Sequence, residues 1–149
     1  MNAHARALIV LTLLSLGGCA SAGLGEADEN ESGARHERGA FVLTGAALTD
    51  GPGSVLATML GKVPNLRVQR LSTACPIVTL RNAVSFQSVV APLVYVDGTH
   101  ATDTCVLESL RAVDVARIEV YPQGFTTRPG YATHAHGLIL IFMRSAGGA

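Results

Sequence analysis

Three cysteines are the residues of this sequence with the clearest chemical use, at positions 19, 75 and 105. Cys75 and Cys105 are about thirty residues apart and form an even pair if the third cysteine is used elsewhere. In an oxidising compartment such a pair favours a disulfide, although two buried free thiols are the alternative because spacing does not prove pairing. Closing a loop of that length would add about 3–4 kcal/mol to the free energy of unfolding by the chain-entropy estimate.

Cys19 comes directly after an apolar segment near the start of the chain. Residues 7–16 (ALIVLTLLSL) are apolar or small, a length typical of the hydrophobic region of a signal peptide and too short for a membrane-spanning helix, which needs about 20. The four residues that end at Cys19 (LGGC) resemble a lipobox, in which cleavage precedes the cysteine and its thiol carries a diacylglyceryl group. We expect a signal peptide over residues 1–18 and lipid on Cys19. The alternative is an ordinary secretory signal cut after Ala20 or Ala22.

Histidines are the other residues that could support chemistry. In an extended segment His134 and His136 would project to one face and could share a metal ion, with His100 as a third ligand. No acidic or cysteine ligand lies near His134 and His136 in sequence. Histidines in loops are usually exposed side chains without a metal, so we expect no metal site.

The sequence contains no arrangement typical of catalysis. It lacks the G-x-S-x-G, Walker A, H-E-x-x-H and C-x-x-C motifs. Two carboxylates, Asp97 in a turn and Glu119 in an apolar strand, have structural explanations. We expect Asp97 to tighten its turn through an Asx hydrogen bond and Glu119 to pair with an arginine or cap a backbone group. We therefore expect no catalytic residue, no cofactor and no enzymatic activity.

Composition indicates one packed domain. The chain has 149 residues, of which 48% are hydrophobic and 15% charged, and its eleven basic and eleven acidic residues cancel. This composition argues against disorder and gives no electrostatic case for nucleic-acid binding. Residues 19–40 are rich in small and acidic residues and predict a flexible tether. We expect a folded domain over residues 41–144 and a short tail over 145–149.

Hydrophobic patterns within residues 41–144 predict an α+β fold, a small mixed sheet with two short helices. A helix over 54–62 is favoured by apolar residues at helical spacing and by Ser54 as N-cap, and a second over 104–111 by Asp103 or Thr104 as cap. Residues 138–142 (LILIF) are apolar without interruption, which predicts a central strand that the two helices cover on both faces. The other expected strands span residues 41–43, 66–71, 77–80, 93–96 and 118–121.

Five segments, in this order, resemble the plug domain of TonB-dependent outer-membrane receptors. They span residues 54–68 (SVLATMLGKVPNLRV), 77–82 (IVTLRN), 93–98 (LVYVDG), 114–121 (DVARIEVY) and 131–144 (YATHAHGLILIFMR). The resemblance covers essentially the whole folded region. It departs from the family at Asn65 and Asn82, where glycine is usual, and no segment resembles the TonB box.

The resemblance implies a plug-like fold and a role in the cell envelope. The sequence ends at Ala149, so we expect no barrel and no transport by this chain alone. The expected function is a lipid-anchored interaction module whose partner is an envelope protein, for example a separately encoded outer-membrane barrel. The alternative is a periplasmic carrier of a small ligand or iron chelate. Ala20 is not the aspartate that signals inner-membrane retention. Its absence favours a location in the outer membrane, with the domain facing the periplasm.

We expect the binding surface on loops 82–91 and 124–137. Gln87, Arg128 and Tyr131 should be exposed residues whose substitution leaves the melting temperature unchanged.

Overall fold

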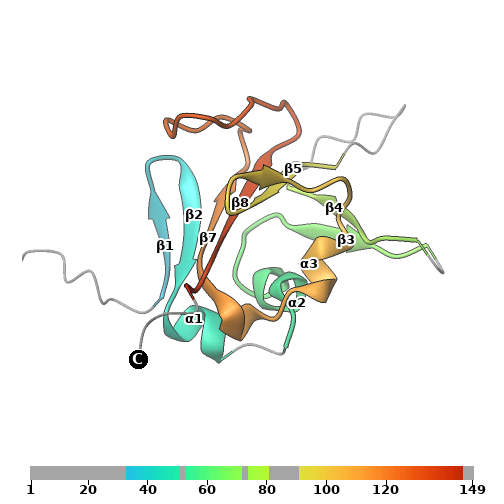
Figure 1. Ribbon diagram of the computed structural model, residues 1–149. Helices are drawn as coiled ribbons and strands as arrows, with labels where there is room; N and C mark the ends of the chain where they lie inside the picture. The colour runs from blue at the N-terminus through green and yellow to red at the C-terminus, as the bar shows by residue number, and fades with distance from the viewer. Residues whose placement is uncertain (1–32, 51–52, 72–73, 81–90, 146–149) are drawn as a thin grey trace, which may run out of the picture.

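The computed structural model describes residues 33–50, 53–71, 74–80 and 91–145 (Figure 1). The expected signal peptide, Cys19, Gln87 and nearly all of the expected loop 82–91 lie outside these residues. Within them, no helix has both the length and the apolar character needed to cross a membrane.

A mixed six-stranded sheet forms the centre of the fold, with the strand order β1-β2-β7-β8-β5-β6. Strands β5 and β8 are parallel and every other neighbouring pair is antiparallel. Strands β3 and β4 form a separate two-stranded sheet. Three short α-helices and one 3-10 helix complete the described part of the chain, which confirms the α+β prediction, although with three α-helices instead of two. The elements are β1 (Ala34–Glu37), β2 (Ala40–Thr44), α1 (Ala46–Thr49), α2 (Val55–Leu60), β3 (Arg67–Gln69), β4 (Ile77–Thr79), β5 (Leu93–Val96), β6 (Thr99–His100), α3 (Val106–Ser109), the 3-10 helix Ala112–Asp114, β7 (Val115–Tyr121) and β8 (Leu138–Met143).

The two predicted helices form, and both are shorter than expected, since α2 spans Val55–Leu60 instead of residues 54–62. Ser54 caps α2 as predicted, because its hydroxyl oxygen accepts a hydrogen bond from the backbone N–H of Ala57 at 3.2 Å. The α3 helix is a single turn that starts after Cys105, so the expected span of 104–111 is too long. The Asp103 carboxylate accepts a hydrogen bond from the N–H of Cys105, one residue before the helix.

The predicted tether is too long at its C-terminal end. Residues expected to be flexible form β1 and the start of β2, joined by a two-residue turn at Arg38 and Gly39, whose φ angles are 47° and 82°. The sequence argument fails here because β1 is an edge strand with exposed side chains. Backbone pairing with β2 holds it, and that pairing needs no large apolar residue.

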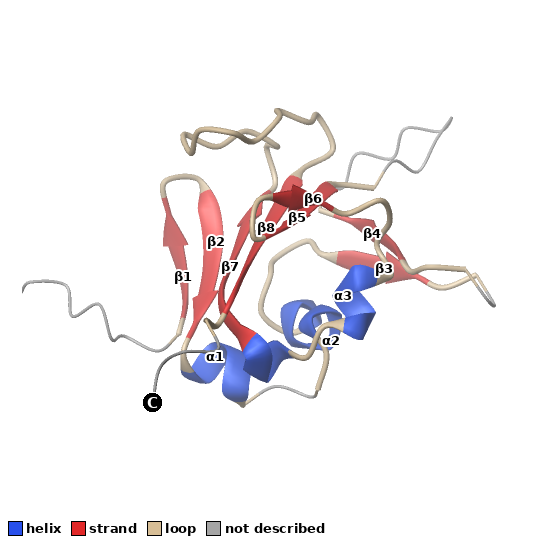
Figure 2. Cartoon of the chain, viewed as in Figure 1, coloured by secondary structure: helices blue, strands red, loops and turns tan. Residues whose placement is uncertain are grey.

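Strand β8 lies in the middle of the sheet, as its sequence predicts. Its residues Leu138 to Ile141 are all buried, with Ile139 and Ile141 in one apolar cluster and Leu138 and Leu140 in another. The first cluster contains side chains of all three α-helices, which lie together on one side of the six-stranded sheet (Figure 2). The second contains none, so the expectation that helices cover both faces is wrong.

We call the face with the helices the helix face and the opposite one the loop face. Residues 122–137, which connect β7 to β8, contribute Tyr131 to the cluster on the loop face. Its ring lies edge-on to that of Tyr95, with 5.1 Å between the centroids. We call residues 122–137 the cover loop.

Candidate functional site

A buried carboxylate, Glu119, lies on the loop face in the middle of the sheet. Its residue is 1% exposed. The strand register places Glu119 between Val42 of β2 and Leu140 of β8, two residues of the apolar cluster on this face. Because side chains alternate along a strand, Arg117 and Tyr121 of β7 lie on the same face as Glu119. An isolated charge in such surroundings is costly, so its partners decide whether it is tolerated.

Four donated hydrogen bonds satisfy the Glu119 carboxylate. Arg128 of the cover loop donates two, from Nε to Oε2 at 2.8 Å and from Nη2 to Oε1 at 2.6 Å. Arg117 donates from Nε to Oε1 at 2.5 Å, and the Tyr121 hydroxyl donates to Oε2 at 2.8 Å. The expectation that Glu119 pairs with an arginine is therefore confirmed. The bidentate geometry of Arg128 is the arrangement in which a guanidinium binds a carboxylate most specifically.

The hydrogen bonds decide the charge state of this site. Burial acts to raise the pKa of Glu119, but hydrogen bonds from Arg128, Tyr121 and Arg117 outweigh it and hold that pKa below its ordinary value. Burial also raises the pKa of the Tyr121 hydroxyl, so it stays a donor. On β1, the hydrogen bond from Arg117 lowers the pKa of Glu37. The carboxylates are therefore anionic and the arginines cationic at neutral pH.

Arg128 is a structural residue as well as a surface residue. Its side chain is 43% exposed, yet it binds a carboxylate that is almost fully buried. Its guanidinium carbon lies 5.1 Å from the centroid of the Phe142 ring, within cation–π distance. Tyr131 is half-buried. The expectation that both could be replaced without changing the melting temperature conflicts with these contacts.

The cover loop is closed on itself at its base. The N–H of His134 donates to the carbonyl oxygen of Gly124 at 2.8 Å. Gly124 has a φ of +74°, and a Cβ at this position would lie 1.6 Å from the carbonyl oxygen of His134, so only glycine fits. Next to it, Phe125 is 61% exposed. The loop thus combines a fixed base with an exposed aromatic side chain.

A hollow of about 250 Å³ lies between the first strands of the sheet and the cover loop. Arg38, Arg117 and Arg128 contribute three positive charges to its lining, and Glu37 and Glu119 contribute two negative ones. The remaining lining residues are Val42, Tyr121, Thr127 and Pro129. This set of side chains is suited to holding a small anionic group, and its surplus of one positive charge matches one negative charge.

The histidines are brought together only in part. The rings of His134 and His136 lie 5.4 Å apart between centroids, whereas His100 packs against Tyr95 at 5.2 Å. Among the described residues, the only group of three potential metal ligands is Cys75, Asp103 and Cys105. Its two sulfur atoms are bonded to each other, so this group is not a metal centre.

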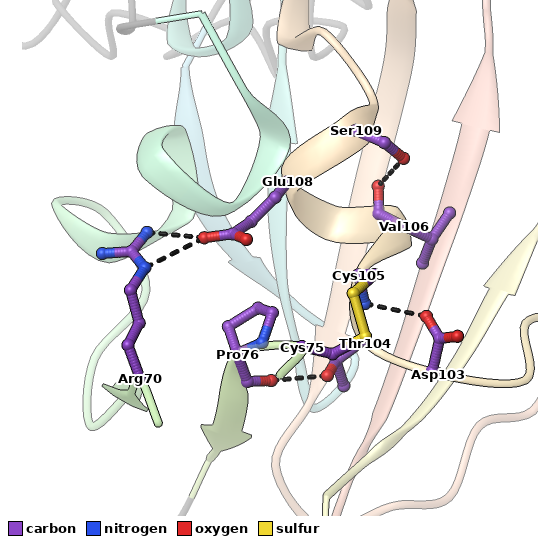
Figure 3. The surroundings of a disulfide bond; sticks show 9 residues. All are labelled: Arg70, Cys75, Pro76, Asp103, Thr104, Cys105, Val106, Glu108 and Ser109. Atoms are coloured by element: carbon purple, nitrogen blue, oxygen red, sulfur yellow. Dashed lines mark hydrogen bonds and ion pairs between the residues drawn. A yellow bond between two sulfur atoms is a disulfide. The ribbon is translucent and has the colours of Figure 1, made fainter. Parts of the chain in front are cut away.

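Cys75 and Cys105 form the disulfide that the sequence predicts, with their Cα atoms 4.7 Å apart. Figure 3 shows the bond between the segment that precedes β4 and the residue that precedes α3. Two contacts lie beside it: Thr104 donates a hydrogen bond to the carbonyl oxygen of Pro76, and Arg70 forms an ion pair with Glu108 at 2.6 Å. The disulfide therefore fixes the two-stranded sheet to α3, away from the hollow.

Asp97 has a different role from the one expected. Its Oδ1 accepts a hydrogen bond from the backbone N–H of Met143 at 2.9 Å, so it joins the end of β5 to the end of β8. The residue has a φ of 47°, a conformation that aspartate tolerates better than most residues. It stabilises the sheet end through a long-range contact instead of an Asx turn.

The group of arginines around the hollow is not evident from the sequence. One local signal was present: Arg117, Glu119 and Tyr121 alternate with apolar residues, which puts three polar groups on one face of an otherwise buried strand. No local pattern indicates Arg38 or Arg128, because a hairpin turn and a loop bring them to that strand.

No model of a known protein family matches the chain. A search of curated proteins also gives no match.

Proposed function

We propose that this protein is a lipid-anchored interaction module of the cell envelope, which docks on an envelope protein through its cover loop. The observation that carries the proposal is the anchoring of that loop. Arg128 holds it to a buried carboxylate while Phe125, three residues away, stays 61% exposed. Binding through a pre-ordered loop avoids much of the entropy cost of ordering it on contact. Aromatic side chains, phenylalanine included, are enriched in the cores of protein interfaces.

The envelope location rests on the N-terminal sequence and on cysteine use. We propose that residues 1–18 are a signal peptide, that Cys19 carries lipid and that the domain faces the periplasm from the outer membrane. The Cys75–Cys105 disulfide supports export, because such bonds persist in oxidising compartments. The segments quoted above further suggest a plug-like domain, with a separately encoded barrel as one class of partner.

A periplasmic carrier of a small ligand or iron chelate is the second candidate. The hollow of about 250 Å³ favours some ligand binding. Pockets that enclose a whole small molecule usually measure about 300–1,000 Å³ and are mostly apolar. The hollow is smaller and charged, so it suits one functional group better than a whole chelate, and we rank the carrier second.

The anchor is tested by cell fractionation and by mass spectrometry of the N-terminus. Wild-type protein should be found with the membranes and begin at a lipid-modified Cys19. Cys19→Ser should be released to the soluble periplasmic fraction or remain as the uncleaved precursor. An unmodified wild-type N-terminus at Ser21 or Gly23 would show an ordinary secretory protein and contradict the anchor.

Docking is tested by placing a photo-crosslinking amino acid at position 125 of the lipidated chain in intact cells and identifying the product by mass spectrometry. We expect one envelope protein. In the chain without the crosslinker, Phe125→Ser should weaken recovery of that protein. Leu71→Ser is the matched control, because Leu71 is also 61% exposed but lies next to β3. Equal recovery from both variants, or crosslinks only to cytoplasmic proteins, would contradict the proposal.

A further inference from the structure

Charged side chains of alternating sign cross the loop face from the edge of the sheet to the cover loop. The ion pairs are Arg35–Glu37 at 3.6 Å, Glu37–Arg117 at 3.0 Å, Arg117–Glu119 at 2.5 Å and Glu119–Arg128 at 2.6 Å. The row begins and ends with arginine, so its three positive charges exceed its two negative ones. Arg38 lies next to this row, in the β1–β2 turn, and adds a fourth positive charge.

The arginines of the hollow retain hydrogen-bond donors after these pairs are made. A guanidinium has five N–H donors. Glu119 and Glu37 engage the Nε and Nη2 groups of Arg117, and Glu119 engages the same two groups of Arg128. Among the contacts of the described residues, Nη1 of Arg117 is left for a ligand, whereas Arg128 also interacts with the Tyr121 hydroxyl and keeps fewer free donors.

Arg38 contributes a guanidinium that the described part of the fold does not otherwise use. It makes no hydrogen bond or ion pair with a described residue, although its charge helps to lower the pKa of Glu37. Its backbone is in the left-handed region, at a φ of 47°, in a two-residue hairpin turn. Asn, Asp or Gly is the usual residue at such a position, because other side chains are strained there. A strained residue whose side chain lines a hollow points to a use for that side chain.

We propose that this hollow binds a carboxylate group, held by the guanidinium groups of Arg38 and Arg117 and by the remaining donors of Arg128. The planar fork of a guanidinium matches a carboxylate. Arg35 does not line the hollow, so the lining itself has a surplus of one positive charge, and its own carboxylates, Glu37 and Glu119, would repel a dianion such as phosphate more strongly than a carboxylate. This inference rests on the proposed docking function and deepens it, since the hollow lies beside the loop that we propose docks. The carboxylate is either a free small molecule or the chain end of a partner protein.

The probes are N-acetylglycine, its uncharged amide, inorganic phosphate and an acetylated triglycine with either a free or an amidated C-terminus. Each is titrated into the isotope-labelled whole chain, and backbone amide signals are followed by NMR. Both free acids should produce saturable shifts around residues 37–40 and 126–128. Tighter binding of the triglycine acid than of N-acetylglycine identifies a chain end as the source, and equal binding identifies a small molecule. Equal binding of acid and amide, stronger binding of phosphate, or no saturable shift would overturn the proposal.

Arg38→Gln removes the one arginine of the hollow that forms no ion pair with a described residue. Loss of a charged hydrogen-bond partner should weaken binding of the acid about tenfold without changing the melting temperature. Arg67→Gln is the matched control, since Arg67 is an exposed arginine on β3. Unchanged affinity in Arg38→Gln, or equal loss in both variants, would overturn the assignment.

The two proposals fail in different ways. If the acids do not bind but the crosslink at position 125 persists, the carboxylate site is wrong and docking stands. If the acids bind and no envelope protein crosslinks, docking is wrong and the hollow is a small-molecule site.

Discussion

The two faces of the six-stranded sheet are held by different physical means. On the helix face, side chains of α1, α2 and α3 pack against the sheet in one continuous apolar cluster. On the loop face the apolar cluster is smaller, and the cover loop is joined to the sheet by Arg128 and the buried Glu119. Apolar packing is non-directional and tolerates rearrangement, whereas a buried ion pair needs every partner in place. We infer that the helix face provides most of the stability and the loop face fixes one loop conformation.

The largest effect should come from the helix face. Leu107 of α3 is fully buried in its cluster, so Leu107→Ala removes buried methyl groups and leaves a cavity. The free energy of unfolding should fall by about 2–5 kcal/mol. Urea denaturation monitored by circular dichroism measures the change. Leu71→Ala, at an exposed position, should stay within about 0.5 kcal/mol of wild type. A similar small loss in Leu107→Ala would show that the helices contribute little.

An intermediate effect is expected from Glu119→Gln on the loop face. The amide nitrogen of glutamine cannot accept hydrogen bonds, so at least one donor among Arg117, Arg128 and Tyr121 loses its partner. We expect a loss of about 1.5–3 kcal/mol, because Arg117 and Arg128 are partly exposed and can turn to water. Unlike Leu107→Ala, this change should increase hydrogen exchange mainly in residues 122–137. Exchange raised uniformly over the domain would contradict the distinction between the two faces.

Acid pH should act mainly on the loop face. The folded-state pKa of Glu119 and of Glu37 is lowered, while an unfolded glutamate titrates near pH 4.3. The unfolded chain therefore binds more protons at mildly acid pH, so the stability from these pairs is present above about pH 4–5 and is lost as pH falls through the folded-state pKa values. Denaturation measured at pH 7, 5, 4 and 3 should show a shallower decline in Glu119→Gln, which keeps only Glu37 of these two carboxylates. Parallel curves would show that the Glu119 pairs do not contribute.

The two faces also differ in how well the sequence predicts them. The helix face follows local patterns: the Ser54 cap, the apolar spacing of α2 and the uninterrupted β8 segment all form as expected. The Cys75–Cys105 disulfide was inferred from the even cysteine pair and the oxidising compartment expected for the chain, and the bond in the structure confirms it. On the loop face, Arg117 binds Glu37 across 80 residues of sequence, and the edge strand that carries Glu37 has no apolar pattern. Periodicity reports which side of an element is buried, but it does not report which distant polar partner arrives there.

The smallest effect, and one of opposite sign, is expected at Arg38 at the edge of the loop face. Asparagine adopts the left-handed conformation more readily than arginine, and Asn-Gly is the favoured sequence of this turn, so Arg38→Asn should raise the free energy of unfolding by about 0.5–1 kcal/mol. Arg38→Gln separates backbone strain from charge, because it removes the charge and keeps a residue that is strained at this φ. If strain is the cause, urea denaturation should show a higher free energy of unfolding for Arg38→Asn than for wild type, and a value close to wild type for Arg38→Gln.

Both variants should bind N-acetylglycine about tenfold more weakly, because both lose the guanidinium. Higher stability with weaker binding would mean that the turn is strained to place a charge in the hollow, whereas unchanged stability in both variants would show that the Arg38 backbone is not strained.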